Sequence, residues 1–195
     1  MALIVLDRQH VGKPGQNDMG AWGDFDKDAK TEVQELEAIL TGFYGLYCEV
    51  RLRELGHNVI SLSDGFYSER HKRACLYGAD AYIALHLNAG KGEYSSCFYD
   101  YRSTKGKLLA DSIATEFKKK LPVSDALVRE TKPDGQFPRP WGCINGVFSG
   151  KPVACLVEPL FIDNFKHQQF LSSESNIHML GCTLAEGIHN WLQRQ

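Results

Sequence analysis

The chain has 195 residues, of which 43% are hydrophobic and 24% are charged, and its formal net charge is -2. This length suits one globular domain with a substantial hydrophobic core. The near-neutral charge argues against a nucleic-acid-binding protein, which would carry a basic patch, and no apolar stretch approaches the ~20 residues that cross a bilayer. We therefore expect no nucleic-acid partner and no membrane insertion.

The N-terminal segment is predicted to be a buried strand. Residues 3–6 are all aliphatic and lead into Asp7 and then His10. No basic leader and no small-residue cleavage site precede the first charge, so we expect synthesis as a mature cytosolic protein.

Residues 11–30 are rich in Gly, Asp and Lys and are predicted to form a loop. Residues 31–34 fit a capping box, and an amphipathic helix is predicted from there to about Gly56. Its apolar stripe is predicted at Leu36, Leu40, Phe43, Tyr47 and Val50. Three glutamates crowd the start of this helix, where acidic side chains suit the helix dipole: Glu32, Glu35 and Glu37.

The rest of the chain alternates predicted strands and helices. Further strands are predicted at 58–62, within 80–90, at 96–101 and at 153–157. Helices are predicted at 67–77, from Ser103 and from about Ser173. The last two carry apolar stripes at Leu109, Ile113, Phe117 and Leu121, and at Ile177, Leu180, Leu184, Ile188 and Trp191. Residues 122–141 hold four prolines and are predicted to form a long loop.

This alternation indicates an α/β fold. We expect a single twisted, mostly parallel sheet of about five to six strands with helices on both faces. The six cysteines form no CxxC pair, which favours small buried thiols over disulfides or a cysteine-ligated zinc site.

Three predicted strands end in a residue that can bind a metal or transfer a proton: His10, His86 and Glu158. A single histidine in an apolar run is more often a hydrogen-bonded core residue. If these strands are parallel neighbours, however, their carboxyl ends meet at one sheet edge, where α/β sheets bind ligands. Two histidines and a carboxylate are a donor set of catalytic zinc sites. The HExxH motif of thermolysin-type peptidases is absent.

The order and spacing of these segments resemble the zinc-dependent N-acetylmuramoyl-L-alanine amidases, in particular the amidase-3 catalytic domains of phage endolysins. The strongest similarity lies in Ala-Leu-His-Leu-Asn-Ala at 84–89 and in Ala-Cys-Leu-Val-Glu-Pro-Leu-Phe-Ile-Asp-Asn at 154–164. It extends from residue 2 to about 192. Around His10 the chain departs from the family, because it lacks the Pro-Gly of the usual Asp-Pro-Gly-His-Gly-Gly turn.

The resemblance implies that zinc (Zn2+) is held by His10, Glu37 and His86 and that Glu158 is the catalytic acid–base. Glu37 is preferred because of its distance to Gly56, and Glu35 stays an alternative. The implied reaction is hydrolysis of the amide between N-acetylmuramic acid and L-alanine in peptidoglycan, leading to bacterial cell lysis. We expect a monomeric single amidase domain over residues 1–195 with no separate cell-wall-binding domain, held in the cytoplasm of the host bacterium until release to the wall.

Two other functions fit the same residues. One is another zinc amidohydrolase or carboxypeptidase-like enzyme acting on a small N-acyl amino acid or peptide. The other is a non-catalytic wall-binding module, against which the strand-end Glu158 argues. Asn88 and Asn164 are expected to be structural more than substrate-orienting, and Trp141 is either a loop anchor or a sugar-stacking residue. The remaining histidines are interpreted as surface or capping residues: His57, His71, His167, His178 and His189.

Overall fold

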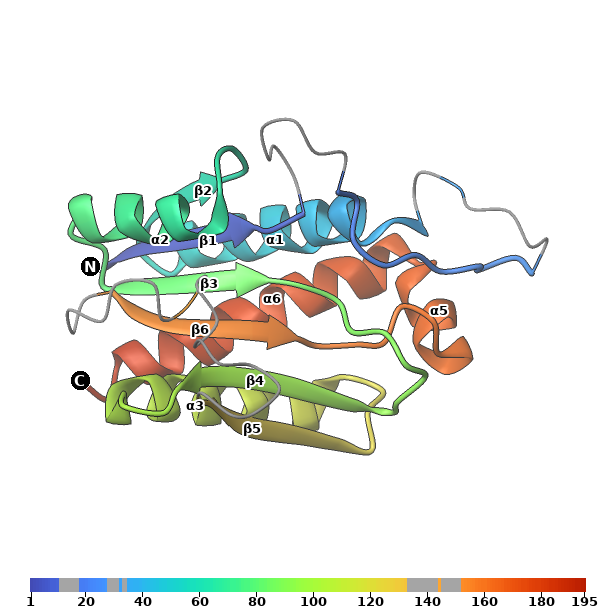
Figure 1. Cartoon of the computed structure of the whole chain (residues 1–195). Coiled ribbons are helices and arrows are strands. Elements are labelled where there is room, and N and C mark those ends of the chain that lie inside the picture. Colours follow the sequence, from blue (N-terminus) through green and yellow to red (C-terminus); the bar gives the residue numbers. More distant parts are fainter. Residues whose placement is uncertain (11–17, 28–31, 33–34, 133–143, 145–151) are drawn as a thin grey trace.

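The computed structural model describes residues 1–10, 18–27, 32, 35–132, 144 and 152–195, and their strands form one six-stranded sheet (Figure 1). The strand order is β2–β1–β3–β6–β4–β5. Neighbouring strands are parallel except β4 and β6, which are antiparallel. The predicted α/β class with a mostly parallel sheet is therefore confirmed. The strands are β1 Leu3–Arg8, β2 Asn58–Leu62, β3 Ala81–Leu85, β4 Tyr94–Asp100, β5 Asp125–Thr131 and β6 Val153–Glu158.

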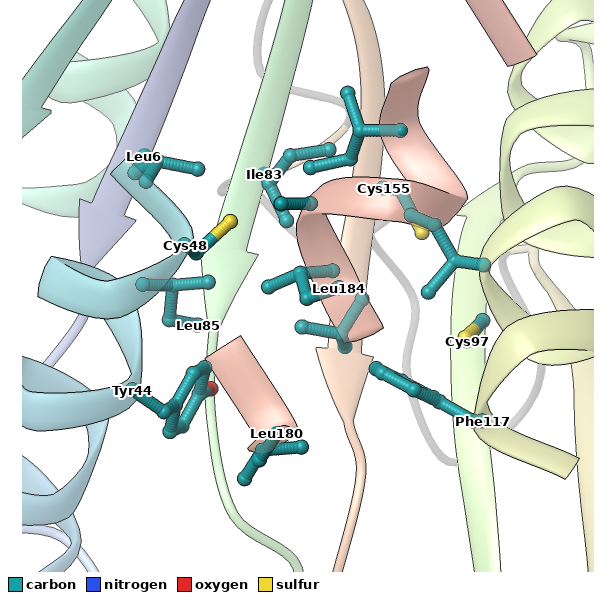
Figure 2. Close-up of a cluster of buried hydrophobic side chains, with 14 of the residues drawn as sticks. Leu6, Tyr44, Cys48, Ile83, Leu85, Cys97, Phe117, Cys155, Leu180 and Leu184 are labelled. Carbon is teal, nitrogen blue, oxygen red and sulfur yellow. The ribbon is translucent and has the colours of Figure 1, made fainter. Parts of the chain in front are cut away.

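The described residues form five helices: α1 Glu37–Glu54, α2 Tyr67–Leu76, α3 Thr104–Lys120, α5 Phe165–Leu171 and α6 Glu174–Leu192. One face is covered by α1, α3 and α6, whose apolar side chains meet alternate strand residues such as Ile83 and Leu85 (Figure 2). The other face, with Tyr82 and Ala84, packs against Ala74 of α2. Helices thus cover both faces, as predicted, and no described helix has the length and apolar character of a membrane span.

The predicted apolar stripe of α1 is wrong in part. Phe43 and Val50 are 48% and 47% exposed, whereas the sheet-facing residues are Leu40, Tyr44, Cys48 and Leu52. The helix therefore has two rows of apolar residues, one that includes Phe43 and one that includes Tyr44. A small residue, Gly45, determines that the Tyr44 row faces the sheet. A Cβ on Gly45 would lie only 2.8 Å from Leu85 Cδ1, so this row fits closely against β3. The proposed capping box at 31–34 falls largely outside the described residues.

Helices α3 and α6 confirm their predicted stripes, since all nine residues are buried. Ser103 is the N-cap of α3, and its Oγ accepts a hydrogen bond from the Gly106 N–H. The predicted long loop at 122–141 is wrong in its first half, because β5 lies there as the outer partner of β4. This edge strand is only partly buried and therefore lacks an apolar run. The short helix α5 was not predicted.

Three of the cysteines, Cys48, Cys97 and Cys155, are buried free thiols, as expected. Cys75 and Cys182 are partly exposed. Cys143 lies outside the described residues.

A buried ion pair joins α2 to the end of β1. Arg70 Nη1 lies 2.7 Å from Asp7 Oδ1, and both side chains are fully buried. The same nitrogen donates to the carbonyl oxygens of Arg8 and Gln9, and Asp7 also accepts hydrogen bonds from Gln9 and Tyr82. This network fixes the chain immediately before His10.

Replacing Arg70 with Met should lower the free energy of unfolding by about 3–5 kcal/mol, because Asp7 would be left as an uncompensated buried charge. The matched control is Arg73→Met in the same helix, whose ion pair with Asp64 is exposed; it should cost less than about 1 kcal/mol. Urea unfolding measures both. Equal losses in the two variants would contradict the role assigned to the buried pair.

Candidate active site

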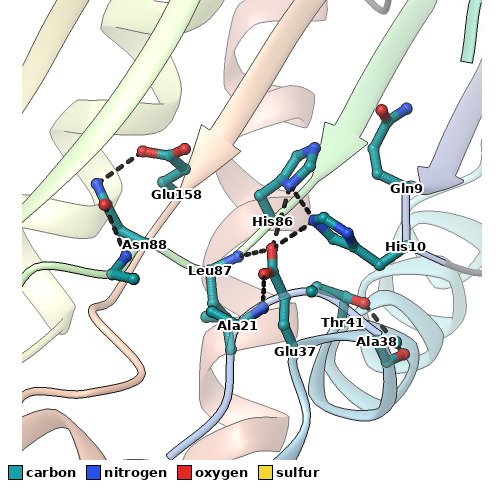
Figure 3. Close-up of polar contacts among 12 residues, drawn as sticks. Gln9, His10, Ala21, Glu37, Ala38, Thr41, His86, Leu87, Asn88 and Glu158 are labelled. Carbon is teal, nitrogen blue, oxygen red and sulfur yellow. Dashed lines mark hydrogen bonds and ion pairs between the residues drawn. The ribbon is translucent and has the colours of Figure 1, made fainter. Parts of the chain in front are cut away.

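The side chains of His10, Glu37 and His86 meet at the carboxyl edge of the sheet (Figure 3). His10 Nε2 lies 3.0 Å from His86 Nδ1 and 3.2 Å from Glu37 Oε1, and His86 Nδ1 lies 3.1 Å from the same oxygen. His10 follows β1, Glu37 opens α1 and His86 follows β3. The parallel pairing of β1 with β3 brings the two histidines together.

These three atoms fit a metal ion. They form a nearly equilateral triangle, and a tetrahedral zinc site with bonds of about 2.0–2.1 Å separates its ligand atoms by roughly 3.3 Å. Two imidazole nitrogens and one carboxylate oxygen also leave one position of a tetrahedron open, as catalytic sites require. The His10 and His86 side chains keep 18% and 15% exposure, so the cluster is reachable from solvent.

The Glu37 carboxylate is fixed by two backbone N–H donors and faces two imidazoles. Its Oε1 accepts from the Leu87 N–H at 2.9 Å as well as facing both histidines, and its Oε2 accepts from the Ala21 N–H at 2.8 Å. Burial opposes ionisation, but the hydrogen bonds with His10 and His86 outweigh it and lower the pKa of Glu37 to about 2. The group is therefore an anion at neutral pH.

His10 is oriented by Asp18, a residue that the sequence did not single out. His10 Nδ1 lies 3.0 Å from Asp18 Oδ1, and since the carboxylate can only accept, this nitrogen carries the proton and Nε2 points at the cluster. Burial opposes protonation of His10, but Glu37 and Asp18 outweigh it and raise its pKa. A carboxylate behind a ligating histidine is the usual second partner in metal sites.

His86 is held through its backbone. Its N–H donates to the Val157 carbonyl at 3.0 Å, and its carbonyl accepts from the Tyr44 hydroxyl at 2.9 Å. Tyr44 belongs to the buried row of α1, so the helix that supplies Glu37 also positions His86.

Glu35, the alternative to Glu37, lies elsewhere. Its carboxylate accepts from the N–H groups of Phe25 and Glu32. It groups with Asp24 and Asp26, whereas Glu37 groups with the two histidines.

Glu158 ends β6, the strand next to β3, and lies near His86 in Figure 3. Its Oε2 accepts from Asn88 Nδ2 at 2.7 Å. Burial and the nearby charge of Glu37 raise the pKa of Glu158 to about 7, while Arg129 and the Asn88 hydrogen bond act in the opposite direction. A carboxyl group with such a pKa can both take up and release a proton at neutral pH.

The two asparagines differ in role. Asn88 donates to Glu158, which fits the orienting role that was the less favoured of the two expectations. Asn164 caps α5 by accepting from the N–H groups of Lys166 and His167, as a structural residue does. Trp141 lies outside the described residues.

The sequence profile of the Amidase_3 family, described as N-acetylmuramoyl-L-alanine amidase, matches residues 4–190. The chain belongs to this family. It is therefore an N-acetylmuramoyl-L-alanine amidase, which acts on peptidoglycan. The family match favours this function over the two alternatives, another amidohydrolase and a non-catalytic wall-binding module. A comparison with curated protein sequences found no match.

Solved structures share the fold of this amidase. Cwp6 from Clostridium difficile has a TM-score of 0.77 at 20% identity, over 97% of this chain and 29% of Cwp6, so the chain spans less than a third of that protein. The amidase AmiC2 of Nostoc punctiforme has a TM-score of 0.77 at 18% identity, over 99% of this chain and 98% of AmiC2. The catalytic domain of the CD27L endolysin, which targets Clostridia difficile, has a TM-score of 0.69 at 22% identity, over 97% and 98%.

A hollow of about 490 Å³ lies beside the cluster of this amidase. Ala21, whose N–H holds Glu37, and Ala89, which follows Asn88, both line it. So does Trp22, which is 52% exposed although its backbone is paired with Leu36. The Trp22 side chain gives the hollow an aromatic wall.

The prediction that the other histidines are surface or capping residues is wrong for three of them. His57, His71 and His167 are buried. His57 pairs with His189 at 2.9 Å, and His167 Nδ1 accepts from the Phe161 N–H. Periodicity could not reveal the burial of His57, because its partner His189 is distant in the sequence.

Gly20 is required by the close approach of Glu37. Its φ is +74°, and a Cβ there would lie 2.5 Å from Glu37 Oε2. We expect Gly20→Ala to displace the carboxylate and to lower the affinity of the amidase for zinc about 10- to 100-fold. The control is Gly78→Ala, with φ +68° and nothing within 4 Å of the added Cβ. Isothermal titration with Zn2+ measures both, and equal affinities would contradict this constraint.

Proposed function

We propose that this amidase depends on zinc, with His10, Glu37 and His86 as its protein ligands and Glu158 as the catalytic acid–base. The observation that carries the proposal is the triangle of two imidazole nitrogens and one carboxylate oxygen, with sides of 3.0, 3.1 and 3.2 Å. Zinc bound there would polarise the scissile carbonyl and lower the pKa of water.

Asp18 and Glu37 prepare the site for a metal ion in different ways. Asp18 keeps the His10 proton on Nδ1, which leaves the Nε2 lone pair for a metal. Glu37 supplies the negative charge that balances a cation, and its low pKa keeps that charge in place. A proton on His10 Nε2 must leave when a metal binds there, and nearby acidic groups raise the pKa of His10, so we expect zinc affinity to fall as the pH is lowered.

Glu158 moves the proton of the reaction. Its carboxylate accepts a proton from the attacking water as the carbon–oxygen bond forms, and gives it to the nitrogen of L-alanine as the carbon–nitrogen bond breaks. The products are a lactyl carboxylate on N-acetylmuramic acid and a peptide with a free amine. Asn88 holds Glu158 Oε2 and leaves its other oxygen for this transfer.

The biological role follows from the same activity. Cleavage at this bond removes stem peptides from the glycan strands, and we propose that the result is lysis of a bacterial cell. We also propose that the enzyme is a monomer and that it is released from the cytoplasm of its host. The fold similarity to the catalytic domain of the CD27L endolysin supports this role.

Purified peptidoglycan digested by the protein should release peptides that begin with L-alanine, together with peptide-free glycan strands. Both products should be lost when a zinc chelator is added and regained when Zn2+ is restored. Mass spectrometry of the digest measures this. Intact muropeptides would contradict the amidase function, and products unaffected by chelation would contradict the zinc dependence alone.

Replacing Glu158 with Gln should lower turnover by about 10²- to 10⁴-fold, because the proton acceptor is lost. Zinc affinity should stay the same, since Glu158 is not a proposed ligand. His86→Ala is the matched comparison and should lose both. Turnover retained by E158Q would remove Glu158 from the mechanism.

The rate should also rise with pH, because Glu158 must be ionised to accept a proton and its pKa is about 7. A bound cation would lower this pKa, so the midpoint of kcat/KM is expected at or slightly below pH 7. Measurements between pH 5 and 8 with a soluble substrate test the sign. A rate that falls across this range would contradict the proposed role.

A further inference from the structure

Arg129 lies on the same face of the sheet as Glu158. Ser96 of β4 pairs directly with Glu158 of β6, and Phe98 of β4 pairs with Arg129 of β5. Paired residues point to the same face of a sheet, and so do residues two apart along one strand. The side chains of Glu158, Ser96, Phe98 and Arg129 therefore all project on one side.

The Arg129 side chain leans toward the catalytic end of the sheet. Its guanidinium carbon lies 5.2 Å from the centre of the Tyr94 ring. Tyr94 is four residues before Phe98 in β4, and Ser96, the partner of Glu158, stands between them. To contact Tyr94, the Arg129 side chain must extend along β5 toward the N-terminal end of that strand. Its guanidinium group then lies at about the level of Ser96, the residue of β4 that pairs with Glu158.

This position is rigid. The Tyr94 ring packs edge-on against Phe161, with ring centres 4.9 Å apart, and Phe161 is 2% exposed. A cation over an aromatic face is attracted by the ring. Ser96, whose small side chain is buried, lies between Glu158 and Arg129 on this face of the sheet.

Arg129 is also exposed, and no carboxylate of the described residues forms an ion pair with it. In the described part of the chain, five other arginines have carboxylate partners: Arg51, Arg53, Arg70, Arg73 and Arg102. Arg129 has no such ion pair in this part of the chain: its guanidinium contacts the Tyr94 ring, and its charge acts on Glu158 from a distance. A fixed guanidinium without a carboxylate presents its paired N–H donors to a planar bidentate anion.

We propose that Arg129 binds a carboxylate of the stem peptide, on the L-alanine side of the scissile amide, and so selects substrates in which that carboxyl group is free. This assignment rests on the proposed amidase function. Arg129 is then a specificity residue, and Tyr94 is the platform that positions it.

The dimensions agree with this assignment. The backbones of Glu158 and Arg129 lie two strands apart across the sheet and two residues apart along it, roughly 12 Å in all, and the Arg129 side chain shortens this interval by reaching back toward Tyr94. A peptide advances at most about 3.5 Å per residue. The carboxylate one or two residues beyond the scissile bond therefore falls within reach of Arg129 when the bond itself lies at Glu158.

The test uses two soluble N-acetylmuramoyl peptides that differ only in whether the first carboxyl group beyond L-alanine is free or amidated. With the zinc-loaded enzyme, kcat/KM should be about tenfold or more higher for the free carboxylate, the effect of one charge-assisted contact. In Arg129→Gln this preference should disappear, through a higher KM for the free form at nearly unchanged kcat.

Matched variants separate recognition from general charge and folding effects. Arg194→Gln removes an exposed arginine at the C-terminal end and should keep the full preference. Arg129→Lys should keep part of this preference, because the positive charge stays but the paired N–H donors of the guanidinium group are lost. Tyr94→Phe should retain it, since the ring is kept. A purely electrostatic effect of Arg129 on Glu158 would change the pH profile of both substrates equally.

Binding of both peptides to the E158Q variant, measured by calorimetry, gives the same comparison without turnover. Equal kcat/KM and equal binding for the two peptides in the wild-type enzyme would overturn the assignment and leave the amidase function standing. A preference that survives in R129Q would do the same. If neither peptide nor peptidoglycan is cleaved, the amidase function fails and this assignment with it.

Discussion

The Glu37 carboxylate is the interaction on which the site depends, because it joins four segments of the chain. It begins α1, faces His10 beyond β1 and His86 beyond β3, and accepts backbone N–H groups from Leu87 and Ala21. A carboxylate that is 3% exposed is costly unless its oxygens are satisfied. Two of the groups that offset this cost, the imidazoles of His10 and His86, would also share a metal with Glu37, so the fold and the proposed zinc site require the same arrangement.

Much of the fold could be predicted where one pattern dominates. The stripes of α3 and α6 and the apolar strands β1, β3 and β6 are buried as their periodicity indicates. Prediction failed where the sequence allows two buried faces, as in α1. The row of residues that includes Phe43 and the row that includes Tyr44 are both apolar, so either could face the sheet. The choice depends on Gly45 fitting against Leu85, a contact between distant segments. It also failed at β5, because an edge strand need not be apolar.

The candidate site divides in the same way. His10, His86 and Glu158 could be found from the sequence alone because each follows an apolar strand, and parallel pairing brings strand ends together. Glu37 was separated from Glu35 only through the family resemblance, since both are buried near the start of one helix. Asp18, Trp22 and Arg129 gave no local signal. Their positions depend on how a loop and an edge strand are registered against the sheet.

Two carboxylates of one site have opposite pKa shifts, and their surroundings explain why. Both are removed from water, which favours the neutral form. Glu37 faces two imidazoles and two backbone N–H groups, so the anion prevails and its pKa falls to about 2. Glu158 has one amide donor and lies in the field of Glu37, so burial prevails and its pKa rises to about 7. A permanently charged group suits a metal ligand, and a group that titrates near neutrality suits an acid–base. The anion that fits a metal site thus also raises the pKa of its neighbour toward the value that proton transfer requires.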